Sequence, residues 1–291
     1  MTSKRPSILF LIPYFGHWPF WMPLFLESCR YNPDIDWLLI SDCPVPVGLP
    51  DNVTVQAMDF PAYCRLATAR LGIPFTPEDP YKLCDIKPAL GHIHEESLQG
   101  YDFWAFGDLD VVYGDLRAWL SDELLARYDV ITSHSRRVAG HFCLLRNTEN
   151  YRTLYRRMKN WQERFCDSEH HALDEGAFTR LFLWRKNFPK PLFKLVGLFN
   201  PLRRKSLFEE TFSTPNGCIP WCDGSFDFPE RWYWRDGVVS SDTAFERQYP
   251  YFHFACWKRG AWRPLGVQDV QAIAASRSWI IDAQGIHFGD L

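Results

Sequence analysis

Residues 101–116, YDFWAFGDLDVVYGDL, place two acids at the end of an apolar run. Trp104 and Phe106 belong to a segment that is typical of a buried strand. In a strand, residues two apart point the same way, so Asp108 and Asp110 would lie side by side. Neighbouring carboxylates repel and raise each other's pKa unless a positive group lies between them. The stretch therefore predicts a divalent cation site. On spacing alone, a turn before a helix capped by Asp115 remains an alternative.

The composition describes a globular protein without a strong overall charge. The chain has 291 residues, 46% of them hydrophobic, which suits one large globular domain or two small ones. Since the sequence has no internal repeat, a single domain over residues 1–291 is the simplest prediction. Lys and Arg number 32 against 35 Asp and Glu, so we expect no nucleic acid partner. Nine scattered cysteines suit a reducing compartment. Cys218 and Cys222, the one close pair, are interpreted as turn-region thiols, since no further zinc ligands are evident.

The N-terminal residues 8–26 are uncharged and long enough to span a bilayer. Pro13, Pro19 and Pro23 would interrupt the continuous helix that lipid requires. The stretch also lacks the small-residue cleavage site of a signal peptide. We therefore expect a strand over residues 7–12, a loop over residues 13–19 and then a helix, in a cytoplasmic protein. The aromatic content leaves peripheral contact with the inner face of the plasma membrane open.

Strands and helices alternate through the first half of the chain. A short apolar run at 34–42 and an alternating pattern at 52–60 predict strands, and a helix over residues 61–72 would end at Gly72. Residues 81–98 are helical in pattern and contain Pro88, so a kink is expected near Lys87. This order predicts an α/β fold with a mostly parallel central sheet flanked by helices. Ligands would bind at the carboxyl ends of the strands.

The remaining chain is expected to differ from this pattern. Helices are predicted over residues 116–128, from 148 to about 166, and from 171 onward, the last opening on Asp174 and Glu175. Strands are predicted at 129–134 and 140–147. Residues 187–250 lack long periodicity, which predicts an irregular, aromatic-rich lid or acceptor region, with a strand pair or lid at 221–237.

A second candidate ligand lies far along the chain, in YFHFACWKR at residues 251–259. A histidine among aromatic residues is most often a core residue, so His253 alone is a weak signal. Lys258 follows five residues later. An imidazole and an ammonium group at the end of an apolar strand would together present a metal ligand and a phosphate contact. Combined with Asp108 and Asp110, these residues form a more specific set.

With these residues the chain resembles the nucleotide-sugar-dependent glycosyltransferases of the GT-A fold. It is most similar to the retaining glycogenin and bacterial galactosyltransferase type, and to a bacterial family of unknown function found with polysaccharide-synthesis enzymes. The resemblance covers most of residues 7–185 and the segment around His253. It implies transfer of a sugar from a nucleoside diphosphate sugar, with UDP as the expected nucleotide. The acceptor would be a bacterial surface glycan or lipid-linked glycan, and retention is favoured.

The resemblance also assigns roles to individual residues. Mn²⁺ or Mg²⁺ would be held by Asp108, Asp110 and His253. Asp174 and Glu175 would act on the transferred sugar or the acceptor, although acids in a first helical turn also suit the helix dipole. The nucleotide sugar would be bound by Tyr14, Phe15, Asp42, Lys87, Gly140, His141 and Lys258.

Some details of the resemblance stay open. The late motif HFACWKRGAW departs from the family's glycine-and-proline form, so Lys258 and Arg259 are alternatives for the phosphate contact. Gly91, four residues after Lys87, follows the spacing of the galactosyltransferase type. Two other functions remain as alternatives, a nucleotidyltransferase and a carbohydrate-binding protein without turnover. A nucleotidyltransferase would be expected to carry a glycine-rich basic loop after its first strand, and PYFGHWPFW is not one.

Overall fold

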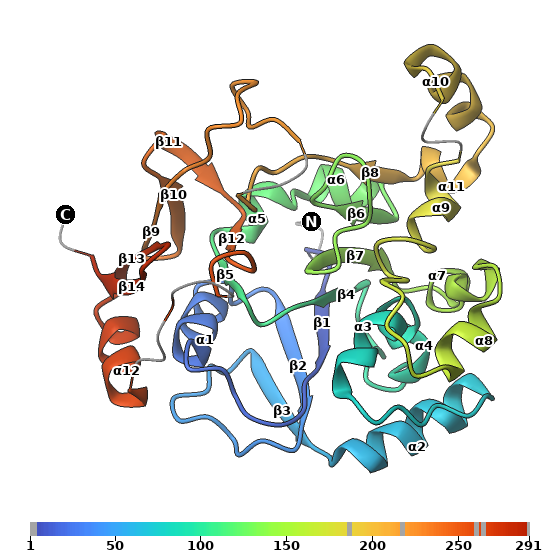
Figure 1. Cartoon of the computed structure of the whole chain (residues 1–291), viewed down its shortest axis with the longest axis horizontal. Helices are drawn as coiled ribbons and strands as arrows, with labels where there is room; N and C mark the ends of the chain where they lie inside the picture. Colours follow the sequence, from blue (N-terminus) through green and yellow to red (C-terminus); the bar gives the residue numbers. More distant parts are fainter. Residues whose placement is uncertain (1–4, 185–187, 216–218, 259–261, 263–265, 290–291) are drawn as a thin grey trace.

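A seven-stranded sheet forms the centre of the molecule, with strand order β3-β2-β1-β4-β7-β6-β8 (Figure 1). The computed structural model describes residues 5–184, 188–215, 219–258, 262 and 266–289. The strands of this sheet are β1 (Ile8–Pro13), β2 (Asp36–Ser41), β3 (Val53–Ala57), β4 (Phe103–Gly107), β6 (Val130–Thr132), β7 (Phe142–Arg146) and β8 (Ser206–Phe208). Within this sheet, β7 runs antiparallel to its neighbours and the other pairs are parallel. The predicted α/β fold with a mostly parallel sheet is confirmed.

Strands β1, β2, β4 and β7 are buried on both faces, which explains why they are almost continuously apolar, whereas edge strand β3 is largely exposed. Every residue of β4 is buried. Trp104 and Phe106 join one core cluster, and Phe103 and Ala105 join another on the opposite face. The first cluster is completed by residues of α2 (Phe60–Leu71), α4 (Leu90–Ile93) and α8 (Trp161–Cys166), and the second by residues of α1 (Met22–Arg30) and α5 (Leu116–Trp119).

The N-terminal half follows the expected order of elements. Helix α2 begins at Asp59, whose side chain accepts from the Ala62 amide at 2.6 Å, and ends at Gly72 with a φ of 70°. Residues 80–93 form the short helices η1 (Pro80–Lys82), α3 (Leu83–Ile86), η2 (Lys87–Ala89) and α4. The expected kink therefore lies at Lys87. Gly91 is needed for packing, because a Cβ there would lie 2.4 Å from the Trp104 ring.

Two predicted long helices are wrong, because local caps and turns divide them. Residues 116–128 form α5 and α6 (Asp122–Arg127), separated where the Ser121 hydroxyl caps α6 by accepting from the Leu124 amide. Residues 148–166 form α7 (Glu149–Arg152), η3 (Leu154–Arg157) and α8. Asn160 adopts a left-handed φ of 55° before α8, which ends any continuous helix.

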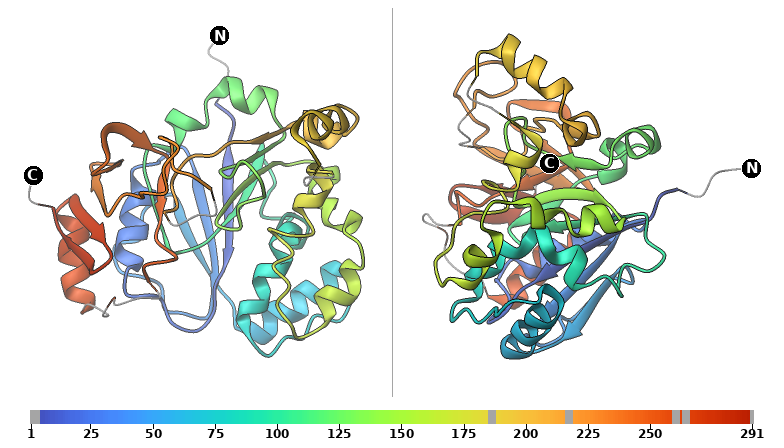
Figure 2. Two further views of the ribbon diagram at one scale, coloured as in Figure 1. Left: turned by 45° about the horizontal axis from the view of Figure 1, so that its top comes forward. Right: turned by 90° about the vertical axis from the view of Figure 1, so that its right-hand side faces the viewer.

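The C-terminal region is more regular than expected. An antiparallel sheet of order β11-β10-β9-β13-β14 lies beside the central sheet (Figure 2). It consists of β9 (Arg231–Arg235), β10 (Val238–Ser241), β11 (Ala244–Tyr249), β13 (Ser278–Asp282) and β14 (Gly285–Phe288), with α12 (Val267–Ala275) between β11 and β13. Of the strand pair or lid predicted at 221–237, only β9 lies within those bounds, and its partner β10 follows directly after them. Stacked Trp234 and Trp279 rings, 3.8 Å apart, lie in its core.

The rest of residues 187–250 also contains regular structure. After α9 (Thr179–Phe182), which precedes this region, helices α10 (Lys190–Leu198) and α11 (Pro201–Arg204) lead into β8, the edge strand of the central sheet. The expectation of an irregular region is therefore wrong for this part. Cys222 is an exposed thiol, and Cys218 lies outside the described residues.

The uncharged N-terminal stretch forms β1, a loop and α1, as predicted. In the described part of the chain, no helix is long and apolar enough to cross a membrane. The aromatic residues of the loop pack inward: the Trp21 ring lies edge-on to Phe254, and Phe20 contacts Trp262. These contacts join the first strand unit to the C-terminal segment.

Candidate functional site

Asp108 and Asp110 lie in the connection between β4 and β5 (Val111–Tyr113), immediately after the strand. The sequence analysis assigned strand geometry to these two acids, but in the structure they lie outside any strand. Leu109 between them is buried in the core, and its carbonyl accepts from Trp21 Nε1 at 2.9 Å. This anchor turns both acids toward the same space. Asp110 is 4% exposed, whereas the Asp108 side chain is 35% exposed.

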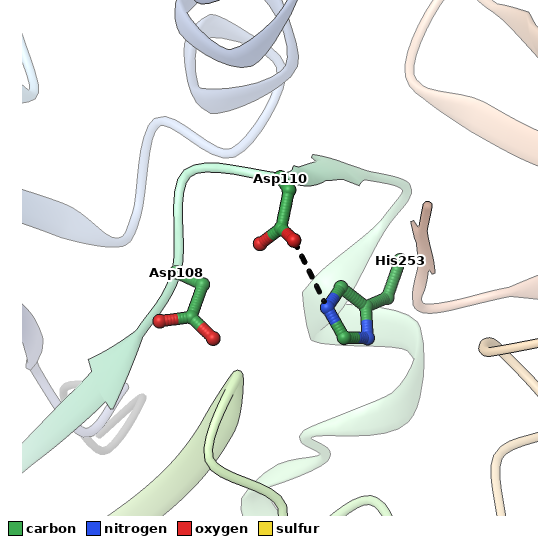
Figure 3. A group of neighbouring side chains, drawn as sticks. All are labelled: Asp108, Asp110 and His253. Atoms are coloured by element: carbon green, nitrogen blue, oxygen red, sulfur yellow. Dashed lines mark ion pairs between the residues drawn. The ribbon is translucent and has the colours of Figure 1, made fainter. Parts of the chain in front are cut away.

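His253 reaches these acids because β12 (Tyr251–His253) pairs antiparallel with β5. The register sets His253 opposite Val111, and the Phe254 amide donates to the Asp110 carbonyl at 3.1 Å. Figure 3 shows the three side chains of Asp108, Asp110 and His253 turned toward one another. Each offers one ligand atom, and these atoms lie within 4.8 Å of one another. We call this group the Asp–Asp–His cluster.

Two lysines balance the carboxylates of the Asp–Asp–His cluster. Lys258 Nζ lies 2.6 Å from Asp110 Oδ2, and Lys87 Nζ lies 2.5 Å from Asp108 Oδ1. Burial alone would raise the pKa of Asp110, but His253 and Lys258 hold it well below its usual range. Burial would lower the pKa of Lys87, yet Asp108 and its other negative neighbours raise it. The sequence predicted a mutual rise in carboxylate pKa unless a positive group lay nearby, and at Asp110 the cations His253 and Lys258 are that group.

His253 is held in place from behind. Its Nδ1 lies 3.2 Å from Thr214 Oγ1, while its Nε2 faces Asp110 Oδ2 at 3.4 Å. A proton on Nδ1 donated to Thr214 leaves Nε2 free to act as a ligand. The His141 ring stacks on His253 with 3.8 Å between centroids, and its Nε2 lies 2.8 Å from the Tyr251 hydroxyl. Burial holds the pKa of His141 well below its usual value, so this ring is neutral.

Asp174 and Glu175 were predicted to begin a helix. They lie instead in a turn before α9. Glu175 Oε1 accepts from the Gly140 amide at 3.2 Å, and Oε2 pairs with Arg137 at 3.0 Å. Asp174 Oδ1 accepts from the Glu175 amide at 2.9 Å. Burial raises the pKa of Asp174 to about 7, because Lys87 Nζ, 3.9 Å from Oδ2, only partly offsets it. Asp174 is therefore a cleft carboxyl group that titrates near neutral pH.

Gly140 links these groups through its backbone. Its carbonyl accepts from Lys87 Nζ at 3.0 Å, and its amide donates to Glu175. A Cβ at this position would lie 2.5 Å from Asp174 Oδ2. Close approach of the carboxyl group to the backbone therefore requires glycine here.

The turn that carries Asp174 is fixed by a second group of charges, Lys82, Asp85 and Asp167, which we call the anchor cluster. Lys82 and Asp85 are fully buried and pair at 3.1 Å, and Lys82 also contacts Asp167 at 3.0 Å. The Asp85 carboxylate accepts from the backbone amides of His171 and Leu173, both at 2.9 Å. Lys82 donates in addition to the carbonyls of Arg164 and Glu169. Every charged atom of the Lys82–Asp85 pair therefore has a partner.

The Asp–Asp–His cluster opens onto a cleft of about 900 Å³ at the carboxyl ends of the parallel strands. Ten of the predicted site residues line it: Tyr14, Phe15, Lys87, Asp108, Asp110, Gly140, Asp174, Glu175, His253 and Lys258. Asp42 does not; its carboxylate accepts from the Gly16 amide at 2.8 Å and so holds the first loop. His141 lies behind His253. Arg259, the alternative to Lys258, lies outside the described residues.

Sequence reasoning missed several lining residues. Arg137, Trp21, Tyr81 and His170 all face the cleft. Arg137 follows Arg136 in a short polar loop, where a basic pair carries no specific signal. Its pairing with Glu175 appears only once β7 and the turn before α9 are brought together.

The donor set suits a hard divalent cation. Two carboxylates and one imidazole on the wall of an open cleft match the oxygen-rich ligand preference of Mn²⁺ and Mg²⁺, with space left for substrate oxygens. Carboxylates that take ammonium and imidazole partners retain further lone pairs for such an ion. The residues present therefore fit the predicted metal.

Comparisons with known proteins give a family and several similar structures. The family described as "Family of unknown function (DUF6625)" matches residues 10–277. No protein with curated annotation matches the chain. Mouse xyloside xylosyltransferase 1 in its apo form is similar over 86% of this chain and 98% of its own, with 10% identity and a TM-score of 0.42.

Two further similar structures belong to galactosyltransferase LgtC. An active-site mutant of LgtC is similar over 93% of this chain and 95% of its own, with 11% identity and a TM-score of 0.44. LgtC with donor and acceptor sugar analogs is similar over 69% of this chain and 84% of its own, with 11% identity and a TM-score of 0.35. These similarities are low, so the function must be argued from the chain's own residues.

Proposed function

We propose that this chain, which belongs to the DUF6625 family, is a metal-dependent glycosyltransferase that uses a nucleoside diphosphate sugar. The observation that supports this most strongly is the Asp–Asp–His cluster on the wall of a large cleft, flanked by Lys87 and Lys258. Two acids and two lysines with an imidazole suit a site for a metal-bound diphosphate better than one for an uncharged ligand.

Lys87 and Lys258 would contact the diphosphate from two sides. Each lysine pairs with one carboxylate of the Asp–Asp–His cluster and lines the cleft, so its ammonium group would lie next to a diphosphate bound there. Mn²⁺ or Mg²⁺ bound by Asp108, Asp110 and His253 would add charge stabilisation as the nucleoside diphosphate leaves. Thr214 and His141 would act as positioning residues that fix the orientation of the His253 ring.

Asp174, Glu175 and Arg137 would bind the transferred sugar. Asp174 lies beside Lys87, which would contact the leaving diphosphate, so Asp174 would suit a hydrogen bond with a sugar hydroxyl on that side. An inverting base would have to stand on the opposite face of the ring. Both oxygens of Glu175 are already engaged, by the Gly140 amide and by Arg137, so neither is free to approach an acceptor hydroxyl. We therefore propose retention of configuration.

The nucleotide would lie toward β1. Tyr14 and Phe15 line this end of the cleft, and the Tyr14 ring is held by stacking on Trp18 at 5.5 Å. UDP is the proposed nucleotide, and a bacterial surface glycan or lipid-linked glycan the proposed acceptor, both from the resemblance to the GT-A type. A cytoplasmic location is proposed from the proline-interrupted N-terminal stretch and the scattered cysteines.

A screen of UDP-, GDP- and dTDP-sugars with Mn²⁺ tests the proposal. We expect one donor to raise the melting temperature, since a ligand that binds only the folded state stabilises it, and to be hydrolysed slowly. Asp108→Asn and Asp110→Asn should abolish both effects, while Asp51→Asn, an exposed acid, should leave them unchanged. No stabilisation by any sugar nucleotide would overturn the proposal.

The same screen separates the two alternatives. A nucleotidyltransferase would instead release pyrophosphate from a nucleoside triphosphate and a sugar phosphate. A carbohydrate-binding protein would be stabilised by glycans without Mn²⁺ dependence and without donor hydrolysis. NMR of the product anomer decides between retention and inversion.

A further inference from the structure

Helix α10 projects from the body of the molecule (Figures 1 and 2). Leu192, Leu195 and Leu198 are 43%, 52% and 65% exposed, and Phe199 directly after the helix is 75% exposed. Residues three, four and seven apart share one side of a helix, so Leu192, Leu195 and Phe199 lie together, with Leu198 next to them. We call these four residues the α10 face.

The chain around the α10 face is strongly basic, although the protein has a net charge of -3. Between Gly176 and Phe208 the sequence has no Asp or Glu. It has these cations: Arg180, Arg185, Lys186, Lys190, Lys194, Arg203, Arg204 and Lys205. Arg180, Arg204 and Lys205 are exposed, and none of them pairs with an acidic side chain among the described residues.

An apolar face beside unpaired cations matches the chemistry of an anionic bilayer surface. The apolar side chains would enter the boundary between headgroups and acyl chains, and the cations would meet anionic headgroups. A second copy of the chain would bring like charges together, which opposes association. Nucleic acid would leave the apolar side chains in water. We propose that α10 docks the protein on an anionic membrane surface, without spanning it.

The orientation of α10 is coupled to the rest of the molecule. Buried Asn200, at the end of α10, donates from Nδ2 to the carbonyls of Leu181 and Phe182 in α9, at 2.9 and 3.0 Å. At the start of α9, Thr179 Oγ1 donates to the Glu175 carbonyl at 2.6 Å. A docked α10 would therefore set the cleft wall in a fixed relation to the membrane. The docking itself does not depend on which reaction occurs in the cleft.

Vesicle sedimentation with the full-length chain tests the docking. We expect the protein to bind vesicles that contain phosphatidylglycerol or phosphatidylserine at least about tenfold more strongly than phosphatidylcholine vesicles, and to be released by high salt. Leu195→Asp and the pair Arg204→Glu with Lys205→Glu should each weaken binding at least about tenfold. Val47→Asp and Arg235→Glu alter exposed residues elsewhere and serve as matched controls.

Thermal unfolding of each variant shows whether it folds, and the changed residues are exposed, so we expect melting temperatures like that of the wild type. Absence of binding to every vesicle overturns the proposal. Equal binding by wild type and Leu195→Asp overturns it as well. Self-association that Leu195→Asp abolishes, without vesicle binding, would show a contact between copies instead and also overturns it.

Discussion

The anchor cluster and the Asp–Asp–His cluster both contain buried charges and differ in how the partners of those charges are arranged. In the anchor cluster, Lys82 and Asp85 take each other and several backbone groups as partners, and both are excluded from solvent. In the Asp–Asp–His cluster, the carboxylates take lysine and histidine side chains as partners and face the cleft.

This difference distinguishes a structural group of charges from the proposed metal-binding group. Buried charges whose polar atoms are fully satisfied fix one backbone geometry. Carboxylates held by side-chain cations can exchange those cations for a ligand at little structural cost. The anchor cluster positions the turn that carries Asp174, and the Asp–Asp–His cluster is left free to bind.

Removing the anchor carboxylate should have the largest effect on stability. Asp85→Ala leaves Lys82 buried with a weaker partner and two backbone amides without an acceptor. Loss of one partner from a buried pair costs about 3–5 kcal/mol of unfolding free energy. Denaturant unfolding measures the change.

The exposed pair of Arg5 and Asp34 is the matched control. Asp34→Ala should change the unfolding free energy by less than about 1 kcal/mol, because solvent screens that pair. Equal losses in Asp85→Ala and Asp34→Ala would show that the anchor cluster has no special role.

Changes to the Asp–Asp–His cluster should instead affect turnover. Asp110→Asn and Asp108→Asn should lower donor hydrolysis on the order of 10²- to 10³-fold, in line with loss of a group that stabilises transition-state charge. Without metal, Asp108→Asn should change stability little, since the Asp108 side chain is 35% exposed. Asp110→Asn should lower stability, because the buried Asp110 charge is held by His253 and Lys258. A variant with normal turnover would remove these carboxylates from the proposed mechanism.

Thr214→Val tests whether the support behind His253 matters. The change removes the acceptor for His253 Nδ1, so the ring loses its preferred tautomer and orientation. We expect Mn²⁺ affinity to fall about tenfold, as for other partners of metal-bound histidines. Thr214→Ser keeps the hydroxyl group and should retain affinity. If valine and serine behave alike, the hydrogen bond has no role.

Asp174 should make stability depend on pH. Its carboxyl pKa is 3.8 ordinarily and about 7 in the folded protein, because it is buried. Between these values the folded state holds a proton that the unfolded state has lost, so stability falls as pH rises and the loss is complete above about pH 7.

Asp174→Asn should remove this dependence. Because one pKa unit corresponds to about 1.4 kcal/mol, we expect a gain of at least that order at about pH 8 and none at about pH 4. Melting curves at both pH values measure it. A gain that is the same under both conditions would contradict the displaced pKa.

The sequence predicted the central sheet because its strands are continuously apolar and separated by helices of ordinary length. It failed for residues 116–128 and 148–166, where periodicity continued through a Ser121 cap and a left-handed Asn160. The C-terminal sheet was missed because its strand β9 pairs with β13, which is distant in sequence. Strands β10, β11 and β12 and helix α12 lie between them in the chain. Such long-range pairing leaves no local signal.

The candidate site was predictable in part. Asp108 and Asp110 were identified as acids that follow the most apolar strand. His253 was predicted as a ligand only because it could combine with these acids and because the chain resembles the GT-A glycosyltransferases. Lys82 and Asp85 were missed because a lysine and an acid three residues apart usually form an exposed pair on a helix. Their burial depends on residues 164–173 folding over them.

Mn²⁺ binding by the intact chain tests the central claim most directly. Electron paramagnetic resonance of free Mn²⁺, with UDP present, should show that the wild-type protein binds the ion, whereas Asp108→Asn, Asp110→Asn and His253→Gln bind it at least about tenfold more weakly. Asp51→Asn, which alters an exposed acid elsewhere, should bind like the wild type. No uptake of Mn²⁺ by the wild type, or equal uptake by the three variants, would contradict the account.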